Sequence, residues 1–358
     1  MKGSILLWFI VLVVFDSNAQ NNYRVSGKID KMTEGIVLLL ADDSGRQDTL
    51  NKAYLKNGFF MFEGKVDGPI AVRLVSTFLE FPFILENSNI TININEDNNL
   101  ITGGEQQEIF NQFVQMNMLF LQEQERFILE LRKAENEGDN ARSSSLMRQY
   151  ESVIADAHQR ERELLEKYAD TYAAALVVSS GKDQLELDSL KARFALLGET
   201  ARATVPGRAV AGLIARLENL KEGNTAPDFT VFSLQGDSLC LYQVNSKLKL
   251  VHFWVSSDVT CRQDNVGLLD LYQRFHLKGL EIVSVSRDKN EQAWIQAVNS
   301  DGMFWRNGLD SKLQVFHLYG VRTLPCTILL DEKNRIIAKN LDIRVFKKKI
   351  REILKKNR

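Results

Sequence analysis

Residues 248–262 read LKLVHFWVSSDVTCR, and the fold of the last third of the chain can be inferred from this segment. Its first part, Leu248–Val255, is almost entirely apolar, which is typical of a strand that is buried on both faces of a sheet. A short polar segment ends this strand. From Cys261 to His276 the apolar residues then recur with the spacing of a helix. A strand that leads directly into a helix predicts an α/β domain.

Strands and helices continue to alternate on both sides of this segment, from Ala226 to the end of the chain. The sheet is therefore expected to be mostly buried between layers of helices. The further strands are predicted at Thr230–Leu234, Leu280–Ser286, Cys326–Asp331 and Arg335–Lys339. The further helices are predicted at Glu291–Val298, Ser311–Tyr319 and Val345–Lys356.

Four motifs of this region resemble those of TlpA/ResA-type thioredoxin-like proteins of the AhpC/TSA kind. In chain order they are Ala226-Pro227-Asp228-Phe229, Phe253-Trp254-Val255-Ser256, Tyr319-Gly320-Val321 with Thr323-Leu324-Pro325, and Leu329-Leu330-Asp331. The resemblance covers about residues 223–358 and implies a thioredoxin fold with a cis peptide bond before Pro325. It also implies a groove beside the active site that holds an extended polypeptide. We expect this groove to be lined by Trp254, Leu324 and Pro325, with packing in the core as the default role of Trp254.

The active-site motif departs from the pattern of that family, which reads W-C-x-x-C-R after F-W-A-S. Here Cys261 aligns with the second cysteine, and Asp258 occupies the place of the first. In the dithiol mechanism the first thiolate attacks a substrate disulfide and the second thiol releases the product. A carboxylate cannot make that attack. It can instead cap the following helix and raise the pKa of Cys261 by like-charge repulsion.

Three routes to thiol chemistry remain open. Cys326 directly follows Pro325 and either forms a pair with Cys261 or is a small buried hydrophobe. His252 precedes Phe253-Trp254 and is either a base for Cys261 or a core histidine. Cys261 could also act alone as a peroxidatic cysteine. The proline and threonine of that motif are replaced by Trp254 and Asp258, which disfavours this route. Cys240 is interpreted as structural. Arg287-Asp288 follows a strand and either lies at the C-terminal edge of a sheet or forms an exposed ion pair, and we favour the ion pair.

The composition excludes several other classes of protein. The chain has 358 residues and a formal net charge of −1, from 45 Lys plus Arg and 46 Asp plus Glu, so no basic field is available for nucleic acid. Three cysteines are too few for a disulfide-rich scaffold or a cysteine-based metal cage. The four histidines lack metal-ligand spacing. We therefore expect neither a metal site nor a cofactor.

The first 19 residues resemble a secretory signal. Lys2 gives a positive start, Ile5–Phe15 is an apolar run, and Ser17-Asn18-Ala19 supplies small residues before a cleavage site. An uncleaved N-terminal anchor is the alternative. No cysteine follows the run, which disfavours a lipoprotein, and no later segment is apolar enough to span a membrane. The protein is expected to be exported to the periplasm or cell envelope.

The middle of the chain is divided into two regions. Short alternating segments in residues 20–103 predict an antiparallel β sandwich or barrel. Residues 104–222 show helical spacing, with two long antiparallel helices that form either a coiled-coil surface for a partner or simply a cover for one another. The thioredoxin-like domain then spans residues 223–358. Its basic tail, Lys347–Arg358, either touches anionic lipid or is the solvated face of a helix.

We therefore predict a multi-domain exported protein with a β domain, a helical middle region and a C-terminal α/β thioredoxin fold. The favoured function is that of a degenerate module that binds a protein or peptide at the cis-proline groove, without dithiol turnover. The alternative is a thiol-disulfide oxidoreductase that uses Cys261 with Cys326, and a one-cysteine peroxidase is a minor alternative. The sequence does not specify the partner, the role of the β domain or the oligomeric state.

Overall fold

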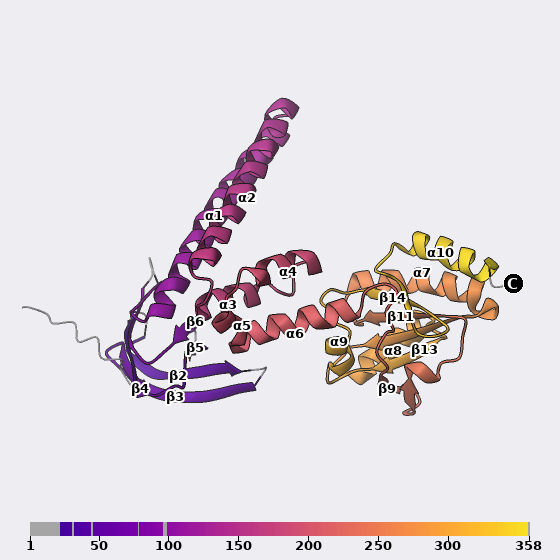
Figure 1. The fold of residues 1–358 in the computed structure, drawn as a ribbon, viewed down its shortest axis with the longest axis horizontal. Coiled ribbons are helices and arrows are strands. Elements are labelled where there is room, and N and C mark those ends of the chain that lie inside the picture. The colour runs from indigo at the N-terminus through magenta and orange to yellow at the C-terminus, as the bar shows by residue number, and fades with distance from the viewer. Residues whose placement is uncertain (1–21, 31, 44–45, 78, 96–98, 357–358) are drawn as a thin grey trace, which may run out of the picture. The chain divides into compact units, whose positions relative to one another are not determined.

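The computed structural model describes residues 22–356, apart from residues 31, 44–45, 78 and 96–98. The predicted signal segment 1–19 lies outside the described residues. The described chain divides into two compact units (Figure 1). The first contains the residues up to Val178 together with Leu196–Pro206, and the second contains Ser179–Ala195 and the chain from Gly207 onward. The boundaries at 103/104 and 222/223 that the sequence suggests stay predictions.

The first unit is built on one strand-rich, nearly barrel-like sheet, with the order β6-β5-β2-β3-β4-β1-β7-β8. Its pairs are antiparallel, except that β1 and β7 run parallel. The alternating pattern of β1 arises because Tyr23, Val25, Gly27 and Ile29 are buried, whereas Arg24 and Lys28 between them are exposed. The strands are β1 (Tyr23–Ile29), β2 (Glu34–Asp43), β3 (Arg46–Lys56), β4 (Phe59–Gly64), β5 (Ile70–Ser76), β6 (Leu79–Leu85), β7 (Asn89–Ile94) and β8 (Asn99–Thr102).

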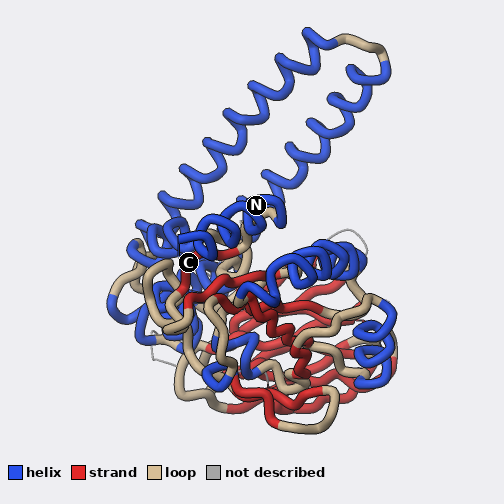
Figure 2. Tube along the Cα trace, turned by 90° about the vertical axis from the view of Figure 1, so that its right-hand side faces the viewer, coloured by secondary structure: helices blue, strands red, loops and turns tan. Residues whose placement is uncertain are grey.

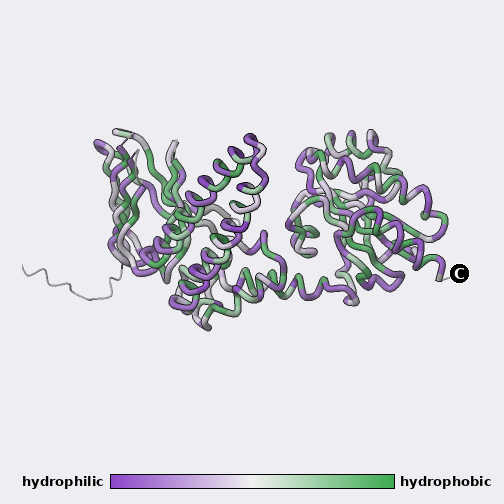
Figure 3. The backbone as a smooth tube through the Cα atoms, turned by 90° about the horizontal axis from the view of Figure 1, so that it is seen from above, coloured by the Kyte–Doolittle hydropathy of each residue, from purple (hydrophilic) through white to green (hydrophobic). Residues whose placement is uncertain are grey.

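Two long helices, α1 (Glu105–Asn136) and α2 (Asn140–Lys167), follow the sheet and form an antiparallel hairpin. Gly138 makes the turn with a φ of 68°, and the Asp139 side chain caps α2 by accepting a hydrogen bond from the Arg142 amide. The rings of Phe127 and Tyr150 stack at 4.1 Å across the seam. Figure 2 shows the two helices joined by this turn, and Figure 3 shows hydrophilic and hydrophobic residues alternating along them.

Four shorter helices complete the middle of the chain and confirm its helical character. They are α3 (Tyr172–Ser180), α4 (Leu187–Ala195), α5 (Glu199–Ala203) and α6 (Val205–Asn219).

The second unit is an α/β domain with the sheet order β10-β9-β13-β12-β11-β14-β15, which confirms the predicted fold class. The central strands β11, β12 and β13 are parallel, as expected where helices connect them. The strands are β9 (Thr230–Ser233), β10 (Ser238–Cys240), β11 (Leu248–Trp254), β12 (Leu280–Ser286), β13 (Arg306–Leu309), β14 (Cys326–Asp331) and β15 (Ile336–Lys339). The helices are α7 (Val259–Phe275), α8 (Glu291–Ser300), α9 (Gln314–Leu318) and α10 (Ile343–Lys356), with 3₁₀ turns η1 (Leu241–Gln243) and η2 (His276–Lys278).

Every residue of β11 is buried, because this strand lies at the centre of the sheet and is covered on both faces. Alternate residues of the strand enter two different core clusters. Leu250 and Trp254 belong to the cluster that includes residues of α7, α8 and α10. Val251 and Phe253 belong to the cluster that includes Phe316 of α9. The faces of this sheet decide which side chains of the candidate site can meet.

Candidate functional site

The candidate site lies where β11 ends and α7 begins. The carboxyl ends of parallel strands are the usual position of sites in α/β sheets. The chain leaves the strand at Trp254 and enters the helix at Val259, with Asp258 as the N-cap. Its backbone at Asp258 is extended, and the Asp258 carboxylate accepts a hydrogen bond of 2.9 Å from the Cys261 amide. The sequence expectation that Asp258 caps this helix agrees with that geometry.

The segment between strand and helix is held by Asp288, which follows β12. The Asp288 carboxylate accepts hydrogen bonds from the Ser256 amide at 3.0 Å and from the Ser256 hydroxyl at 2.7 Å. The Ser286 hydroxyl donates to it at 2.6 Å. Asp288 is 6% exposed, so the interpretation of Arg287-Asp288 as an exposed ion pair is wrong for the aspartate. The parallel pairing of β11 with β12 brings Asp288 next to Ser256. The local sequence does not reveal this pairing.

The thiol of Cys261 lies inside the domain rather than at its surface. Cys261 is 0% exposed and packs in the same cluster as Trp254. Burial raises the pKa of this thiol to about 12. A main-chain hydrogen bond from Val255 opposes that effect, and the charge of Asp258 adds to it. The same arrangement lowers the pKa of the Asp258 carboxyl, chiefly because the Cys261 amide donates to its charged form. The thiolate of Cys261 is therefore strongly disfavoured.

Cys326 lies on the other face of the sheet. In the pairing of β14 with β11 it is opposite Phe253, and both side chains enter the cluster next to α9. Burial raises the pKa of the Cys326 thiol to about 11. Cys261, Cys326 and Cys240 are all free. The Cys261–Cys326 pair that the sequence left open is not formed, because neighbouring residues of a strand point to opposite faces and the two thiols have the sheet between them.

His252 is entirely buried, with a hydrogen bond of 3.1 Å between its Nδ1 and the Ser284 hydroxyl. The indole Nε1 of Trp305 donates to the same hydroxyl at 2.7 Å. The Nε2 atom of His252 has no partner among the described residues. Burial lowers the pKa of His252 to about 3, so the ring is neutral. Within the described part of the chain, His252 makes no hydrogen bond to Cys261. Its polar contact is with Ser284 of β12 instead.

The three predicted groove residues differ in exposure. Trp254 is 0% exposed and packs in the core, so its side chain supports the site from below and does not line a surface groove. Leu324 and Pro325 are half-buried, and the peptide bond between them is cis. Thr323, which precedes them, reaches solvent, as do Val259 and Thr260 on the first turn of α7.

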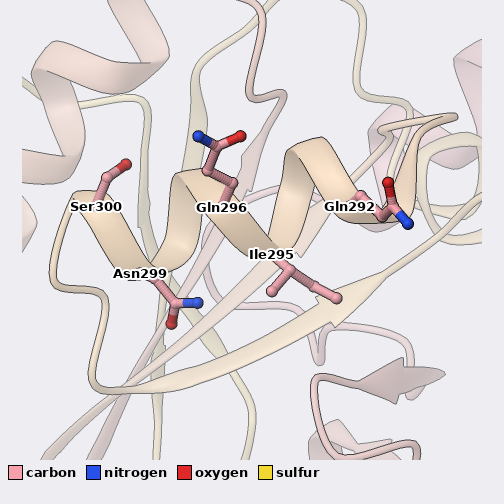
Figure 4. A pocket seen from close by; sticks show the side chains of 5 residues that line it. All are labelled: Gln292, Ile295, Gln296, Asn299 and Ser300. Atoms are coloured by element: carbon pink, nitrogen blue, oxygen red, sulfur yellow. The ribbon is translucent and has the colours of Figure 1, made fainter.

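Other depressions do not coincide with this site. Figure 4 shows one along α8, lined by Gln292, Ile295, Gln296, Asn299 and Ser300. Their side chains point to different sides of the helix and include no titratable group. Within residues 22–356, outside the gaps named above, no group of His, Cys, Asp and Glu side chains is placed to hold a metal ion. In that same part of the chain, no helix has the length and apolar character needed to cross a membrane.

Comparison with known proteins identifies two family models along the chain. Residues 23–110 match a domain of unknown function, DUF4369. Residues 223–339 match the AhpC/TSA family. The thiol-disulfide oxidoreductases ResA of Bacillus thuringiensis and Bacillus subtilis are 27% and 26% identical to this chain. The matches cover 35% of this chain in each case, and 73% and 70% of the relatives.

Solved structures give matches over the same part of the chain. The thioredoxin domain of a thiol-disulfide oxidoreductase from Bacteroides vulgatus is 31% identical, over 38% of this chain and 99% of that domain, with a TM-score of 0.36. A thiol:disulfide interchange protein from Bacteroides sp. is also 31% identical, over 38% of this chain and 92% of its own, with a TM-score of 0.37. The C-terminal domain of this chain belongs to the AhpC/TSA family and is a thioredoxin-like domain of the TlpA/ResA type.

Proposed function

We propose that this protein is an exported thioredoxin-like module that binds a protein or peptide and does not turn over dithiols. In this proposal Asp258 stands where active relatives have the attacking cysteine, so the C-x-x-C site is degenerate. The observation that carries the proposal is the Asp258–Cys261 contact. A carboxylate occupies the N-terminus of α7, and the one thiol of the motif lies beneath it with no exposed surface.

The pKa values and positions of the two buried thiols support the proposal that this domain does not turn over dithiols. Thiol-disulfide exchange needs an accessible thiolate. The pKa values of about 12 for Cys261 and about 11 for Cys326 leave almost no thiolate at neutral pH. The two thiols also lie in different core clusters, so neither can resolve a mixed disulfide formed on the other without rearrangement of the sheet.

The binding surface that we propose is the cis-proline segment beside the start of α7. Leu324 and Pro325 are half-buried there, and Val259 is 71% exposed on the first turn of the helix. An extended polypeptide would lie across this surface, with Trp254 packed below it as support. Export to the periplasm or cell envelope is part of the proposal, on the basis of the signal-like residues 1–19.

The experiment that tests this function is an insulin-reduction assay on the protein without residues 1–19, with dithiothreitol as the electron donor. We expect no acceleration above the uncatalysed rate, and no difference between the wild type and Cys261→Ser. Cys240→Ser is the matched control, because it removes a thiol outside the motif. Turnover that disappears in Cys261→Ser but not in Cys240→Ser would overturn the proposal and establish the alternative, a thiol-disulfide oxidoreductase that uses Cys261.

A further inference from the structure

The outer side of α10 carries a line of positive charge. Arg344, Lys348, Arg351 and Lys355 recur at intervals of four and three residues, which places them on one side of a helix. All four side chains are exposed. Arg344 is bridged to Asp342 at 3.0 Å, and one acid, Glu352, lies nearby on the exposed side. The line is about 17 Å long. The whole chain has a formal net charge of −1, so the chain outside these four residues is net negative, and the line is a local excess of positive charge.

The opposite side of α10 is fixed in the domain core. Phe346 and Ile350 are 0% exposed, and Leu354 is 7% exposed. The helix therefore cannot turn over to insert its apolar side elsewhere. Its cations are presented outward in a constant orientation.

An exposed apolar side chain follows the neighbouring helix, near the end of α10. Gly267 of α7 faces Ile343, and Asp270 of α7 pairs with Lys347 at 2.7 Å, so α7 and α10 run in parallel (Figure 1). Their ends consequently lie together, and Phe275 and Leu354 share one core cluster. Leu277 and Lys278 follow directly in η2. Leu277 is 96% exposed, and Lys278 is also exposed.

We propose that this surface, formed by Arg344, Lys348, Arg351, Lys355, Leu277 and Lys278, binds the anionic headgroups of a phospholipid bilayer. The row of long basic side chains complements the dense negative charge of an anionic membrane surface. An adjacent exposed leucine fits the boundary between headgroups and acyl chains. Docking here is independent of the thiols of the candidate site.

The test is sedimentation of the protein, without residues 1–19, with vesicles of phosphatidylcholine alone or mixed with phosphatidylglycerol. We expect binding to the mixed vesicles that weakens steeply with added salt, and no binding to phosphatidylcholine alone. The variant Lys348→Glu/Arg351→Glu/Lys355→Glu should bind at least about a hundredfold more weakly, since each basic residue near such a surface contributes about fivefold. Leu277→Ser should weaken binding severalfold and leave its salt dependence unchanged.

The matched control is Lys289→Glu/Lys312→Glu/Lys333→Glu, which makes the same change of net charge at exposed lysines outside this surface. We expect it to keep most of the binding, and the unfolding midpoints of both triple variants should show that they fold. An equal loss of vesicle binding in the two triple variants would show that only the net charge of the protein matters, and it would overturn the proposal. Absence of wild-type binding to phosphatidylglycerol vesicles at low salt would also overturn it, and would leave the surface to an acidic protein.

Discussion

The carboxylate of Asp258 accepts a hydrogen bond from the main-chain amide of Cys261, at 2.9 Å, while the thiol of Cys261 points into the core. The same three-residue interval that serves dithiol chemistry in active thioredoxin-like proteins here serves helix capping. One residue therefore has a structural role at the position where, in our proposal, a nucleophile has been lost.

The first prediction concerns this cap. Asp258→Ala should lower the unfolding midpoint of the C-terminal domain by a few degrees at neutral pH, because the first turn of α7 loses its acceptor. The folded-state pKa of Asp258 is lowered, so its contribution is present above the ordinary value of 3.8 and is lost as the pH falls through the folded value. Asp258→Asn, which still caps, is the control and should stay close to the wild type. An equal loss in both variants would contradict a capping role.

The second prediction restores the motif. Asp258→Cys places a thiol at the N-terminus of α7, where the helix dipole favours the thiolate. If only the nucleophile is missing, this variant should form a reversible disulfide with Cys261 and gain insulin-reductase activity. The measurements are the number of free thiols after oxidation, which should fall by two relative to the reduced variant, and the rate of insulin precipitation. Adding Cys261→Ser should abolish both effects.

The sequence predicts the strand and helix around this site because their signals are local. The apolar run 248–255 is long enough to define β11, and the spacing after Cys261 defines most of α7. The face that each thiol occupies depends on the register of β14 against β11, and a shift of one residue would move Cys326 to the side of Cys261. No local pattern specifies that register, so the sequence alone does not decide whether Cys261 and Cys326 can pair.

Two other features were missed for related reasons. Asp288 is separated from Ser256 by 32 residues, and only the parallel pairing of β11 with β12 brings them together. The strand β3 has no apolar pattern of its own that would predict it, because its residues are mostly polar. This strand is stabilised by its long antiparallel pairing with β2, and its residues Ala53 and Leu55 pack in the core.

The third prediction concerns the reactivity of the thiols. Cys240 is partly exposed, with its Sγ 3.3 Å from a carboxylate oxygen of Asp228, whereas Cys261 and Cys326 are buried. In the native protein at pH 8 we expect one thiol, Cys240, to react quickly with a maleimide, and the other two to react only on the timescale of unfolding. At that pH a thiol with a pKa of about 12 is ionised in about one molecule in ten thousand. Cys240→Ser should remove the fast phase, and a fast phase that persists in this variant would contradict the structure.

The fourth prediction concerns the segment before α7. Asp288→Ala removes the acceptor of three hydrogen bonds and leaves the Ser256 amide and hydroxyl without it. Hydrogen bonds to a charged, buried acceptor are worth more than neutral ones, so we expect a loss of about 3 kcal/mol in the unfolding free energy of this domain. Asp237→Ala, at an exposed aspartate of the same domain, is the control and should change stability little. Urea unfolding followed by tryptophan fluorescence measures both, since Trp254, Trp294 and Trp305 all lie in this domain.

The fifth prediction follows from the burial of His252. Its folded-state pKa is about 3 against an ordinary value of 6.5, so between these values the unfolded chain binds a proton that the folded domain does not. Stability should therefore be lost as the pH falls from about 6.5 toward 3, with a contribution from this residue of about 1.4 kcal/mol per pH unit. His252→Gln should flatten the slope by that amount over this range, although the variant itself is less stable. The exposed His317, changed to Gln, is the control and should keep the wild-type slope. An unchanged slope in His252→Gln would show that the ring is protonated in the folded domain, and a charged ring could not be the neutral partner of Ser284 described above.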